Sequence, residues 1–277
     1  MELHLLRIHV ELSWGYSVKV PSTSAAEPSL LMPPPTTLIG AFAKGLSYVL
    51  GDRVECLVDS GRLASYAVKA SSFIASAHAG FKSRQALTSW SDLTRSYAVP
   101  YLQTQYRTPK DKAMWFGVHA LGKVYAPSMK VSLAYVVNAS KAKAVLGSEW
   151  RGLLMKSSFC LSSLGSKEGM VSVDDADLSP LREVSGNVVE TLYYAPLEAV
   201  EAAPAGRAVL EFWDPRSMEA WLSSAKAGVS MVAYVTPLDV ESMIPAVLRL
   251  RLSRLGVALT VDSDPSTTVV LLKRWLE

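Results

Sequence analysis

Hydrophobic and polar residues alternate along the first part of the chain, over residues 3–13. One set of alternate positions holds Leu6, Ile8, Val10 and Leu12, and the other holds Arg7, His9, Glu11 and Ser13. Neighbouring side chains of a β-strand point to opposite faces, so this pattern predicts a half-buried strand. Residues 15–20 are expected to continue into a second extended piece.

The pattern changes to a helical one in LLMPPPTTLIGAFAKGLSYVLG, residues 30–51. The prolines exclude a helix before them, Thr36 or Thr37 can cap a new one, and Gly51 can end it. Its buried face is expected to hold Ile39, Phe42, Leu46 and Val49. The opposite face, with Gly40, Lys44 and Ser47, is small enough for another backbone to approach closely.

Further elements follow from the same two periodicities. Strands are predicted at 64–79, 129–137 and 170–173, and helices at 139–147 and 148–163. Residues 80–127 have no clean period, but they carry so many aromatic side chains that a structured insertion, such as a long hairpin, is favoured over a disordered loop. The second half is β-rich, with strands predicted at 188–197, 207–213, 229–238 and 247–255 and a short helix at 215–226.

This order of elements predicts an α+β protein. Strand, helix and strand, then an insertion, then strand, helix and strand suit a ferredoxin-like (RRM-like) core over residues 1–180. The insertion, at about residues 80–127, would form a basic hairpin or thumb. Residues 181–277 would then be a β-rich C-terminal extension.

Composition narrows the class of protein. Apolar residues make up 49% of the 277 and the mean hydropathy is +0.20, as in a folded chain with a large core. No apolar run is long enough to span a membrane, and Glu2, His4 and Arg7 interrupt any signal peptide, so a cytoplasmic protein is expected. Cys56 and Cys160 are interpreted as buried thiols, not a zinc site or disulfide framework. Only five side-chain amides occur, which favours a thermophilic origin, although a charged fraction of 19% does not.

The charge is concentrated in one segment. Residues 81–130 hold eight lysines and arginines and two aspartates, which gives eight minus two, or +6, in a chain of net charge +3. This imbalance favours contact with a polyanion. A solvated loop with a chance excess of charge explains it equally well at this point.

Two motifs together resemble a known family. PPPTTLIGAFAKGL, residues 33–46, and LGSKEG, residues 164–169, are similar to segments of the Cas-five family of CRISPR-associated proteins, ferredoxin-like RNA-binding proteins. The resemblance covers roughly the first 180 residues and looks most like the archaeal type I-A branch. A glycine-rich loop that the family carries near the end of the core has no clear counterpart, since Gly256 stands alone.

The resemblance implies a subunit of a Cascade surveillance complex. Such a subunit caps the complex at the 5′ end of the CRISPR RNA and holds the repeat-derived 5′ handle. It touches a Cas-seven-type backbone subunit and the large subunit, and a thumb-like insertion packs into the RNA. In most branches a separate Cas-six endonuclease matures the RNA, but in one branch the Cas-five protein itself cuts the repeat.

Candidate RNA-binding residues come from three segments. In LGSKEG, bare backbone N–H groups, Ser166 and Lys167 could hold a phosphate, or Gly165 could simply cap a helix before a turn. Lys44 lies on the small face of the predicted helix, and Leu46 stands where a phosphate loop requires lysine, which excludes a nucleotide-binding loop. In the insertion, cations would follow phosphates and rings would stack on bases, although the rings could instead form its own core. The insertion candidates are Lys82, Arg84, Tyr106, Arg107, Lys110 and Lys112.

Catalysis has weaker support. His4 and His9 have opposite parity on one strand and cannot pair, whereas His78 and His119 flank the insertion and would meet if it were a hairpin. The cluster Asp174, Asp175 and Asp177 is interpreted as a solvated turn and not as a metal site. No catalytic residue, metal or cofactor is therefore expected. The favoured function is a non-catalytic RNA-binding subunit; the alternatives are a metal-independent endoribonuclease that processes repeat RNA and a scaffold that meets only protein.

Overall fold

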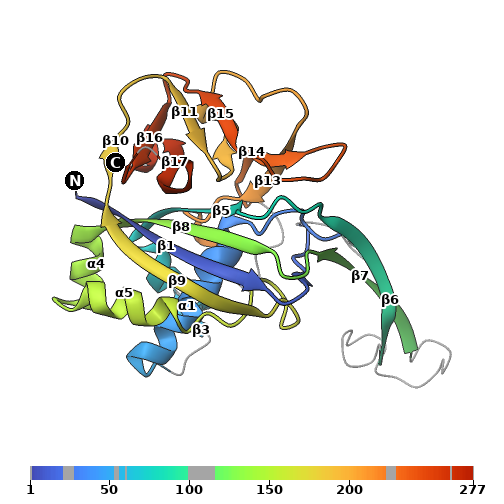
Figure 1. The fold of residues 1–277 in the computed structure, drawn as a ribbon. Coiled ribbons are helices and arrows are strands. Elements are labelled where there is room, and N and C mark those ends of the chain that lie inside the picture. Colours follow the sequence, from blue (N-terminus) through green and yellow to red (C-terminus); the bar gives the residue numbers. More distant parts are fainter. Residues whose placement is uncertain are drawn as a thin grey trace.

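The computed structural model describes residues 2–20, 28–52, 56–59, 61–98, 116–222, 229–262 and 264–276 (Figure 1). The helices are α1 Pro35–Leu50, α2 Ala67–Ser71, α4 Ala139–Leu146 and α5 Trp150–Ser158. The strands of the first 180 residues are β1 Leu3–Leu12, β2 Gly15–Tyr16, β3 Cys56–Asp59, β4 Arg62–Ser65, β5 Ile74–Phe81, β6 Thr88–Ala98, β7 Phe116–Tyr125, β8 Lys130–Asn138 and β9 Val171–Pro180. The later strands are β10 Arg182–Glu183, β11 Val188–Thr191, β12 Ala195–Pro196, β13 Arg207–Trp213, β14 Met231–Asp239, β15 Leu248–Arg251, β16 Gly256–Thr260 and β17 Thr268–Leu272.

A four-stranded antiparallel sheet forms the centre of the molecule, in the order β5-β8-β1-β9. Helix α1 follows the first of these strands in the chain, and α4 and α5 follow the third. The α+β class predicted from the sequence is therefore confirmed.

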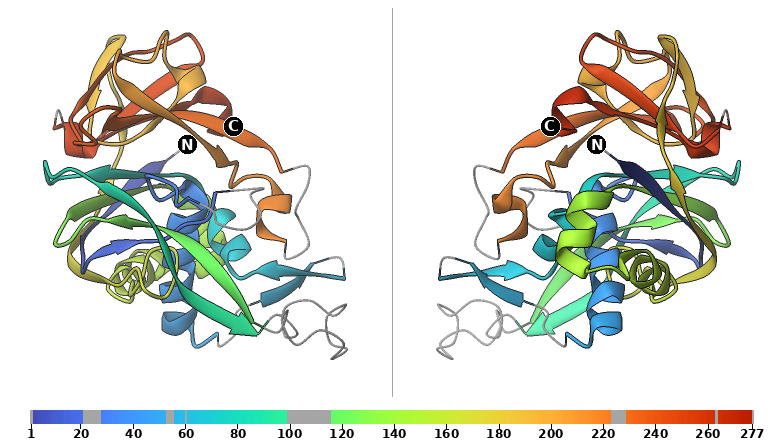
Figure 2. Two further views of the ribbon diagram at one scale, coloured as in Figure 1. Left: turned by 90° about the vertical axis from the view of Figure 1, so that its right-hand side faces the viewer. Right: turned by 90° about the vertical axis from the view of Figure 1, so that its left-hand side faces the viewer.

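The sheet lies between two other layers (Figure 2). Helices α1, α4 and α5 cover one face, where the ring of His4 on β1 meets that of Trp150 on α5 at 5.3 Å. The β-rich region after residue 180 covers the other face, where Arg7 reaches Ser266. The alternation predicted for residues 3–13 therefore holds only in the second half of β1, because Leu3 and Leu5 are buried beneath the C-terminal strands.

The C-terminal region contributes small antiparallel sheets, in the orders β12-β14-β13, β10-β16-β17 and β11-β15. Tyr194, Phe212 and Tyr234 stack against one another with ring centroids 5.2–5.3 Å apart, and Tyr194 also meets His78 of β5 at 5.7 Å. Buried residues of both halves form one hydrophobic cluster. The division of the chain at residue 180 stays a prediction.

The hairpin expected in the insertion is formed by β6 and β7, which project from one end of the sheet (Figure 1). They pair antiparallel from Thr88 opposite Tyr125 to Ala98 opposite Phe116. The tip of the insertion, residues 99–115, lies outside the described residues. In the part of the chain that the structure describes, no helix is both long and apolar enough to cross a membrane.

Helix α1 differs from the prediction at its start and on its open face. Pro34 precedes the helix without a capping side chain, and Thr36 and Thr37 lie inside the first turn, so neither threonine is the cap. The close backbone approach is at Gly45 and not at Gly40: a Cβ on Gly45 would lie 2.4 Å from the carbonyl oxygen of Ser157 on α5, whereas nothing lies within 4 Å of one on Gly40. Helix α1 therefore packs against α5 at Gly45, and not at Gly40 as the sequence predicted.

Other predictions are corrected by the chain path. The predicted strand 64–79 is interrupted by α2, and 188–197 is split into β11 and β12. Residues 174–177 lie on β9 and not in a turn, and the short helix predicted at 215–226 is only a 3-10 turn over Met218–Trp221 in the described part. Cys56 is exposed and Cys160 half-buried, so the thiols are not buried.

Candidate nucleic-acid interface

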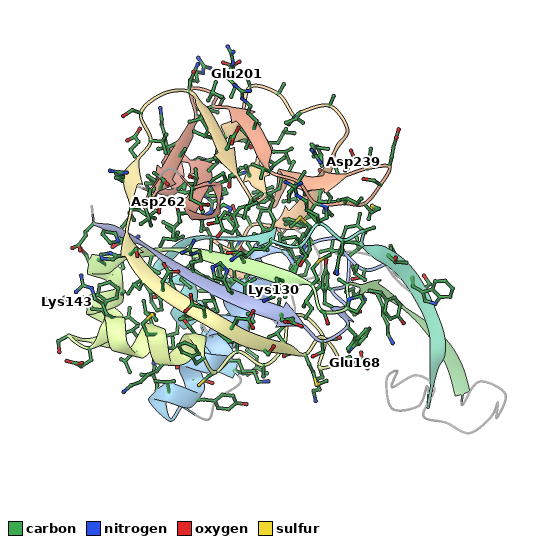
Figure 3. The ribbon with its side chains drawn as sticks, in the orientation of Figure 1. Lys130, Lys143, Glu168, Glu201, Asp239 and Asp262 are labelled. Atoms are coloured by element: carbon green, nitrogen blue, oxygen red, sulfur yellow. The ribbon has the colours of Figure 1, made fainter. Side chains whose placement is uncertain are left out.

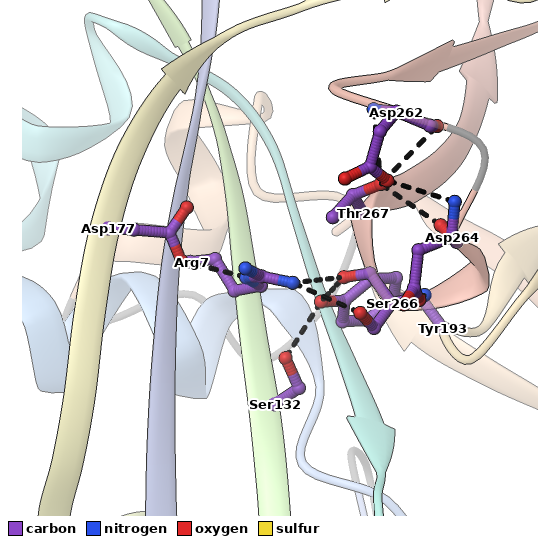
Figure 4. Close-up of polar contacts among 8 residues, drawn as sticks. All are labelled: Arg7, Ser132, Asp177, Tyr193, Asp262, Asp264, Ser266 and Thr267. Carbon is purple, nitrogen blue, oxygen red and sulfur yellow. Dashed lines mark hydrogen bonds and ion pairs between the residues drawn. The ribbon is translucent and has the colours of Figure 1, made fainter.

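The sheet face that an RRM uses as a base-stacking platform is covered in this protein. Arg7 Nη1 donates to Ser266 Oγ at 3.0 Å, and the Tyr193 hydroxyl donates to the Ser266 carbonyl oxygen at 2.8 Å (Figure 4). Tyr193 also lies 2.7 Å from Ser132 Oγ of β8. These contacts fasten the C-terminal region to the middle of the sheet, so this face is not open to a ligand.

The LGSKEG loop is docked on the N-terminal segment and is not an open phosphate cradle. Three of its six backbone N–H groups donate within the protein: Leu164 to the Gly169 carbonyl oxygen at 2.8 Å, Gly169 to that of Ser166 at 3.0 Å, and Ser166 to that of Ser17 at 3.0 Å. The Ser166 hydroxyl donates to Glu168 Oε2 at 3.3 Å. Lys167 is exposed and is the ligand candidate that the loop leaves accessible.

Close packing accounts for the first glycine of this loop. Gly165 has φ +75°, and a Cβ there would lie 2.5 Å from the Ser17 carbonyl oxygen. Gly165 does not cap a helix, since α5 ends at Ser158. A left-handed conformation and a neighbouring backbone together exclude any larger residue.

Ser17 joins the loop to the hairpin. Its carbonyl oxygen accepts from Ser166, and its hydroxyl donates to the carbonyl oxygen of Gly122 on β7 at 2.7 Å. Next to it, the rings of Trp14 and Tyr125 lie 5.5 Å apart, and Lys123 Nζ lies 5.4 Å from the Trp14 ring. We call this junction of residues 14–18, 122–126 and 164–169 the hairpin base.

Lys82 and Arg84 lie on the segment that leads from β5 into the hairpin, and both are exposed. The segment is held against β8, because Lys82 N donates to Lys130 O at 2.9 Å and Lys130 N donates to Ser83 Oγ at 2.9 Å. The pKa of the His9 ring is lowered, mainly by burial and then by the positive charges of Lys82 and Arg7. The two cations therefore stand beside the start of the hairpin on a fixed backbone.

Lys44 lies in a different layer. It is exposed on α1, and its Nζ is 3.4 Å from Ser162 Oγ in the segment between α5 and the LGSKEG loop. No described contact joins it to Lys82 or Arg84. The remaining candidates, Tyr106, Arg107, Lys110 and Lys112, lie outside the described residues.

Sequence reasoning did not select Trp90 as a site residue. Trp90 on β6 is 60% exposed and lies opposite Lys123 of β7 in the hairpin register. An exposed tryptophan across from a lysine suits a nucleotide, with a base on the ring and a phosphate on the ammonium. Only the register of β6 and β7 brings these two residues together, so no pattern along the chain indicates their pairing.

The histidines do not form a visible catalytic pair. His78 is completely buried, its Nδ1 lies 3.0 Å from the Tyr194 carbonyl oxygen, and burial lowers its pKa to about 4. In the sheet it faces Ala134, while the backbone of His119 faces Arg95 in the hairpin. The side chain of His119 lies outside the described part. A buried, neutral His78 is poorly placed to accept a proton from an RNA hydroxyl.

Two of the three aspartates of β9 make ion pairs. Asp177 accepts from Arg7 Nε at 2.8 Å, and Asp174 lies 3.5 Å from Lys130 Nζ. Among the described residues, no cluster of three or more His, Cys, Asp or Glu side chains is arranged to hold a metal ion.

Comparison with known proteins identifies the family. The chain is 32% identical over 189 residues to CRISPR-associated protein Cas5 2 of Saccharolobus solfataricus, a match that covers 68% of this chain and 66% of that protein. It is 27% identical over 232 residues to CRISPR system aCascade subunit Cas5 1 of the same archaeon, covering 84% of this chain and 87% of that protein. No family model matches the chain.

A solved structure supports the fold. The crystal structure of a CRISPR protein from Archaeoglobus fulgidus superposes with a TM-score of 0.53 at 16% identity, over 97% of this chain and 98% of that one. The chain belongs to the Cas5 family of CRISPR-associated proteins, which confirms the Cas-five resemblance. The match to the first of these relatives spans just under two thirds of that protein's length.

Proposed function

We propose that this protein is a non-catalytic RNA-binding subunit of a type I CRISPR Cascade surveillance complex in the cytoplasm. It holds the 5′ handle of the CRISPR RNA and contacts a Cas-seven-type backbone subunit and the large subunit. The observation that carries the proposal is the projecting hairpin, with the exposed cations Lys82 and Arg84 on the segment that leads into it and the exposed Lys167 in the loop docked at its base. Membership of the Cas5 family, with one relative named as an aCascade subunit, supports the assembly.

The order of the central sheet supports a ferredoxin-like core. In chain order the strands β1, β5, β8 and β9 occupy positions 3, 1, 2 and 4 of the sheet order β5-β8-β1-β9, with helices after β1 and after β8. This is the split βαβ arrangement. Its edge strand β5 leads directly into the hairpin, so the core provides a rigid mount for the projecting strands.

Charge supports RNA as the ligand of the hairpin. The segment 81–130 carries +6, and Lys82, Arg84 and Lys167 are exposed near its start and base. Clustered cations on a projecting element attract a phosphate backbone, while the covered sheet face leaves no RRM-type platform. The RNA therefore follows the hairpin and not the sheet.

Binding to labelled repeat RNA tests the proposal. Purified protein is titrated with the RNA in EDTA at two salt concentrations, and the products are run on a denaturing gel. We expect binding that weakens as salt rises, without cleavage. Charge reversal at Lys167 and at Lys82 with Arg84 should weaken it, whereas Lys143→Glu should not, because Lys143 lies on α4 at the end of the molecule opposite Glu168 and the hairpin (Figure 3).

Other outcomes identify the alternatives. A discrete cut product in EDTA would favour the endoribonuclease. Binding that does not respond to salt, or an equal loss in the Lys143 variant, would contradict a phosphate contact at the hairpin base. Absence of RNA binding both alone and with the backbone subunit present would leave only the scaffold function.

A further inference from the structure

A cavity of about 120 Å³ lies at the other end of the molecule from the hairpin. It forms where the connection from α2 to β5, the start of α4 and the C-terminal end of the chain meet. Its wall includes Ser72, Phe73, Asn138, Lys141, Arg216 and Trp275. One water needs roughly 10–15 Å³ of such volume, so the cavity has room for a ligand of several atoms.

The charged groups of this wall are all cationic. Lys141 and Arg216 line the cavity, and no aspartate or glutamate lies among the described lining residues. The Lys141 side chain has no hydrogen-bond or ion-pair partner among the residues that the structure describes. An unpaired ammonium beside a cavity without carboxylates attracts an anion.

Arg216 is held in place before any ligand arrives. Its Nε and Nη2 donate to the two carboxylate oxygens of Asp214 at 2.8 and 2.5 Å, and its guanidinium lies 4.0 Å from the centroid of the Trp275 ring. The pair with Asp214 offsets much of its charge, so Lys141 supplies the excess positive charge. A fixed guanidinium presents its remaining N–H groups in a defined direction, which lowers the entropic cost of binding.

The start of helix α4 belongs to the same wall. Asn138 is its cap and no acidic residue lies in its first turn, so the helix dipole adds positive potential here. The backbone N–H groups of Ala139 and Lys141 already donate, to the Glu2 carbonyl oxygen at 3.0 Å and to Asn138 Oδ1 at 3.0 Å. Trp275 is 9% exposed, and its ring packs against the Arg216 guanidinium, so it contributes an apolar part of the wall.

We propose that this cavity binds a phosphate group. A phosphate offers a negative charge opposite the Lys141 ammonium and acceptor oxygens for the Arg216 N–H groups that do not donate to Asp214. The group comes from free phosphate or a nucleotide, or from the phosphorylated end of a nucleic acid. The site is separate from the hairpin base and does not depend on the handle-binding function.

Thermal unfolding with inorganic phosphate tests the site. The full chain is unfolded in rising phosphate at constant ionic strength, set with sodium chloride. The midpoint should rise with phosphate, since a ligand of the folded state stabilises it. Lys141→Gln should weaken the apparent Kd at least tenfold, and Lys143→Gln, a matched exposed lysine on the same helix, should not change it. No rise for the natural chain, or equal effects of the two variants, would overturn the proposal.

Two further arms separate the sources of the ligand. A 5′-phosphorylated oligonucleotide is compared with its 5′-hydroxyl twin, so that contacts elsewhere cancel. A preference for the phosphorylated form that Lys141→Gln removes assigns a nucleic-acid end, and phosphate binding without that preference assigns the free ligand.

Discussion

Arg7 and Asp177 face each other across neighbouring strands of the sheet, and Arg7 Nε donates to Asp177 Oδ1 at 2.8 Å (Figure 4). The same guanidinium reaches Ser266 Oγ at 3.0 Å, in the 3-10 turn Pro265–Thr267 that precedes β17. The side chain of Arg7 on β1 therefore links its own strand to the edge strand β9 and to the C-terminal region. This contact is part of the reason that the sheet face is closed to RNA.

Replacement of this arginine should lower stability. Arg7→Met leaves the Asp177 carboxylate, whose side chain is 31% exposed, without its partner, and it removes the bond to Ser266. We expect a loss of about 1–3 kcal/mol in the free energy of unfolding, measured by urea denaturation.

A surface ion pair provides the matched control. Arg251 lies 3.8 Å from Glu201 with both side chains more than half exposed, and Arg251→Met should change the free energy by less than about 1 kcal/mol. Equal effects of the two substitutions would show that the contacts of Arg7 do not fasten the layers.

Gly165 should tolerate no side chain. Gly165→Ala places a methyl group 2.5 Å from a backbone oxygen at φ +75°, so the loop or the segment at Ser17 has to move. We expect a loss of about 1–3 kcal/mol in the free energy of unfolding. By contrast, Gly152→Ala, at the third residue of α5, meets nothing within 4 Å and should stabilise the protein by about 0.5–1 kcal/mol. A neutral Gly165→Ala would contradict the docked geometry of the loop.

Local periodicity predicted the parts of the fold that depend on neighbours in the chain. The strand at 3–13, the helix ending at Gly51, the two helices after β8 and the strand at 207–213 all follow from side-chain spacing. Periodicity could not predict which side chains are buried by residues that are distant in the chain. Leu5 is buried on the same face of β1 as Arg7, because the C-terminal region, which Arg7 contacts at Ser266, covers that face.

The candidate site was predicted by residue type but not by arrangement. Charge density pointed to Lys82 and Arg84, and glycine spacing pointed to LGSKEG. The connection through Ser17, whose two oxygens contact the loop and the hairpin at once, has no sequence signal. Likewise, Trp90 and Lys123 lie opposite each other only because of the register in which β6 and β7 pair. The 17 residues between these strands, 99–115, lie outside the described residues.

His78 should make the protein sensitive to mild acid. Its pKa is about 4 in the folded chain, against an ordinary value of 6.5, because burial disfavours the charged ring. The unfolded chain therefore binds the proton first as pH falls. The contribution of His78 to stability is complete above pH 6.5 and is lost as pH falls from there through 4, at a total of about 3 kcal/mol.

Unfolding free energies at pH 7 and pH 5 check this. The natural chain should lose about 2 kcal/mol from His78 over that interval, and more in total because burial also lowers the pKa of His4 and His9. His78→Gln should be less dependent on pH, whatever its stability at pH 7. An unchanged pH dependence would mean that His78 titrates normally and is open to solvent.

Trp90 should contribute to RNA binding and little to folding. Its ring is 60% exposed on β6, so Trp90→Ala should leave the free energy of unfolding within about 0.5 kcal/mol. If a base stacks on the ring, binding to repeat RNA should weaken by about 1–3 kcal/mol. Tyr48→Ala is the matched control, because Tyr48 is 63% exposed on α1, in the helical layer. An equal loss in both variants would indicate a nonspecific effect of removing aromatic surface.

Lys82 and Arg84 can be tested by the salt dependence of binding and not only by affinity. For single-stranded nucleic acid, each phosphate contact contributes about 0.7 to the slope of log K against log salt. Lys82→Gln with Arg84→Gln should therefore lower that slope by about 1.4 if each cation neutralises one phosphate. Lys143→Gln should leave the slope unchanged. A lower affinity with an unchanged slope would mean that the double variant disturbs the segment held by Ser83 and Lys130, and that neither cation touches the RNA.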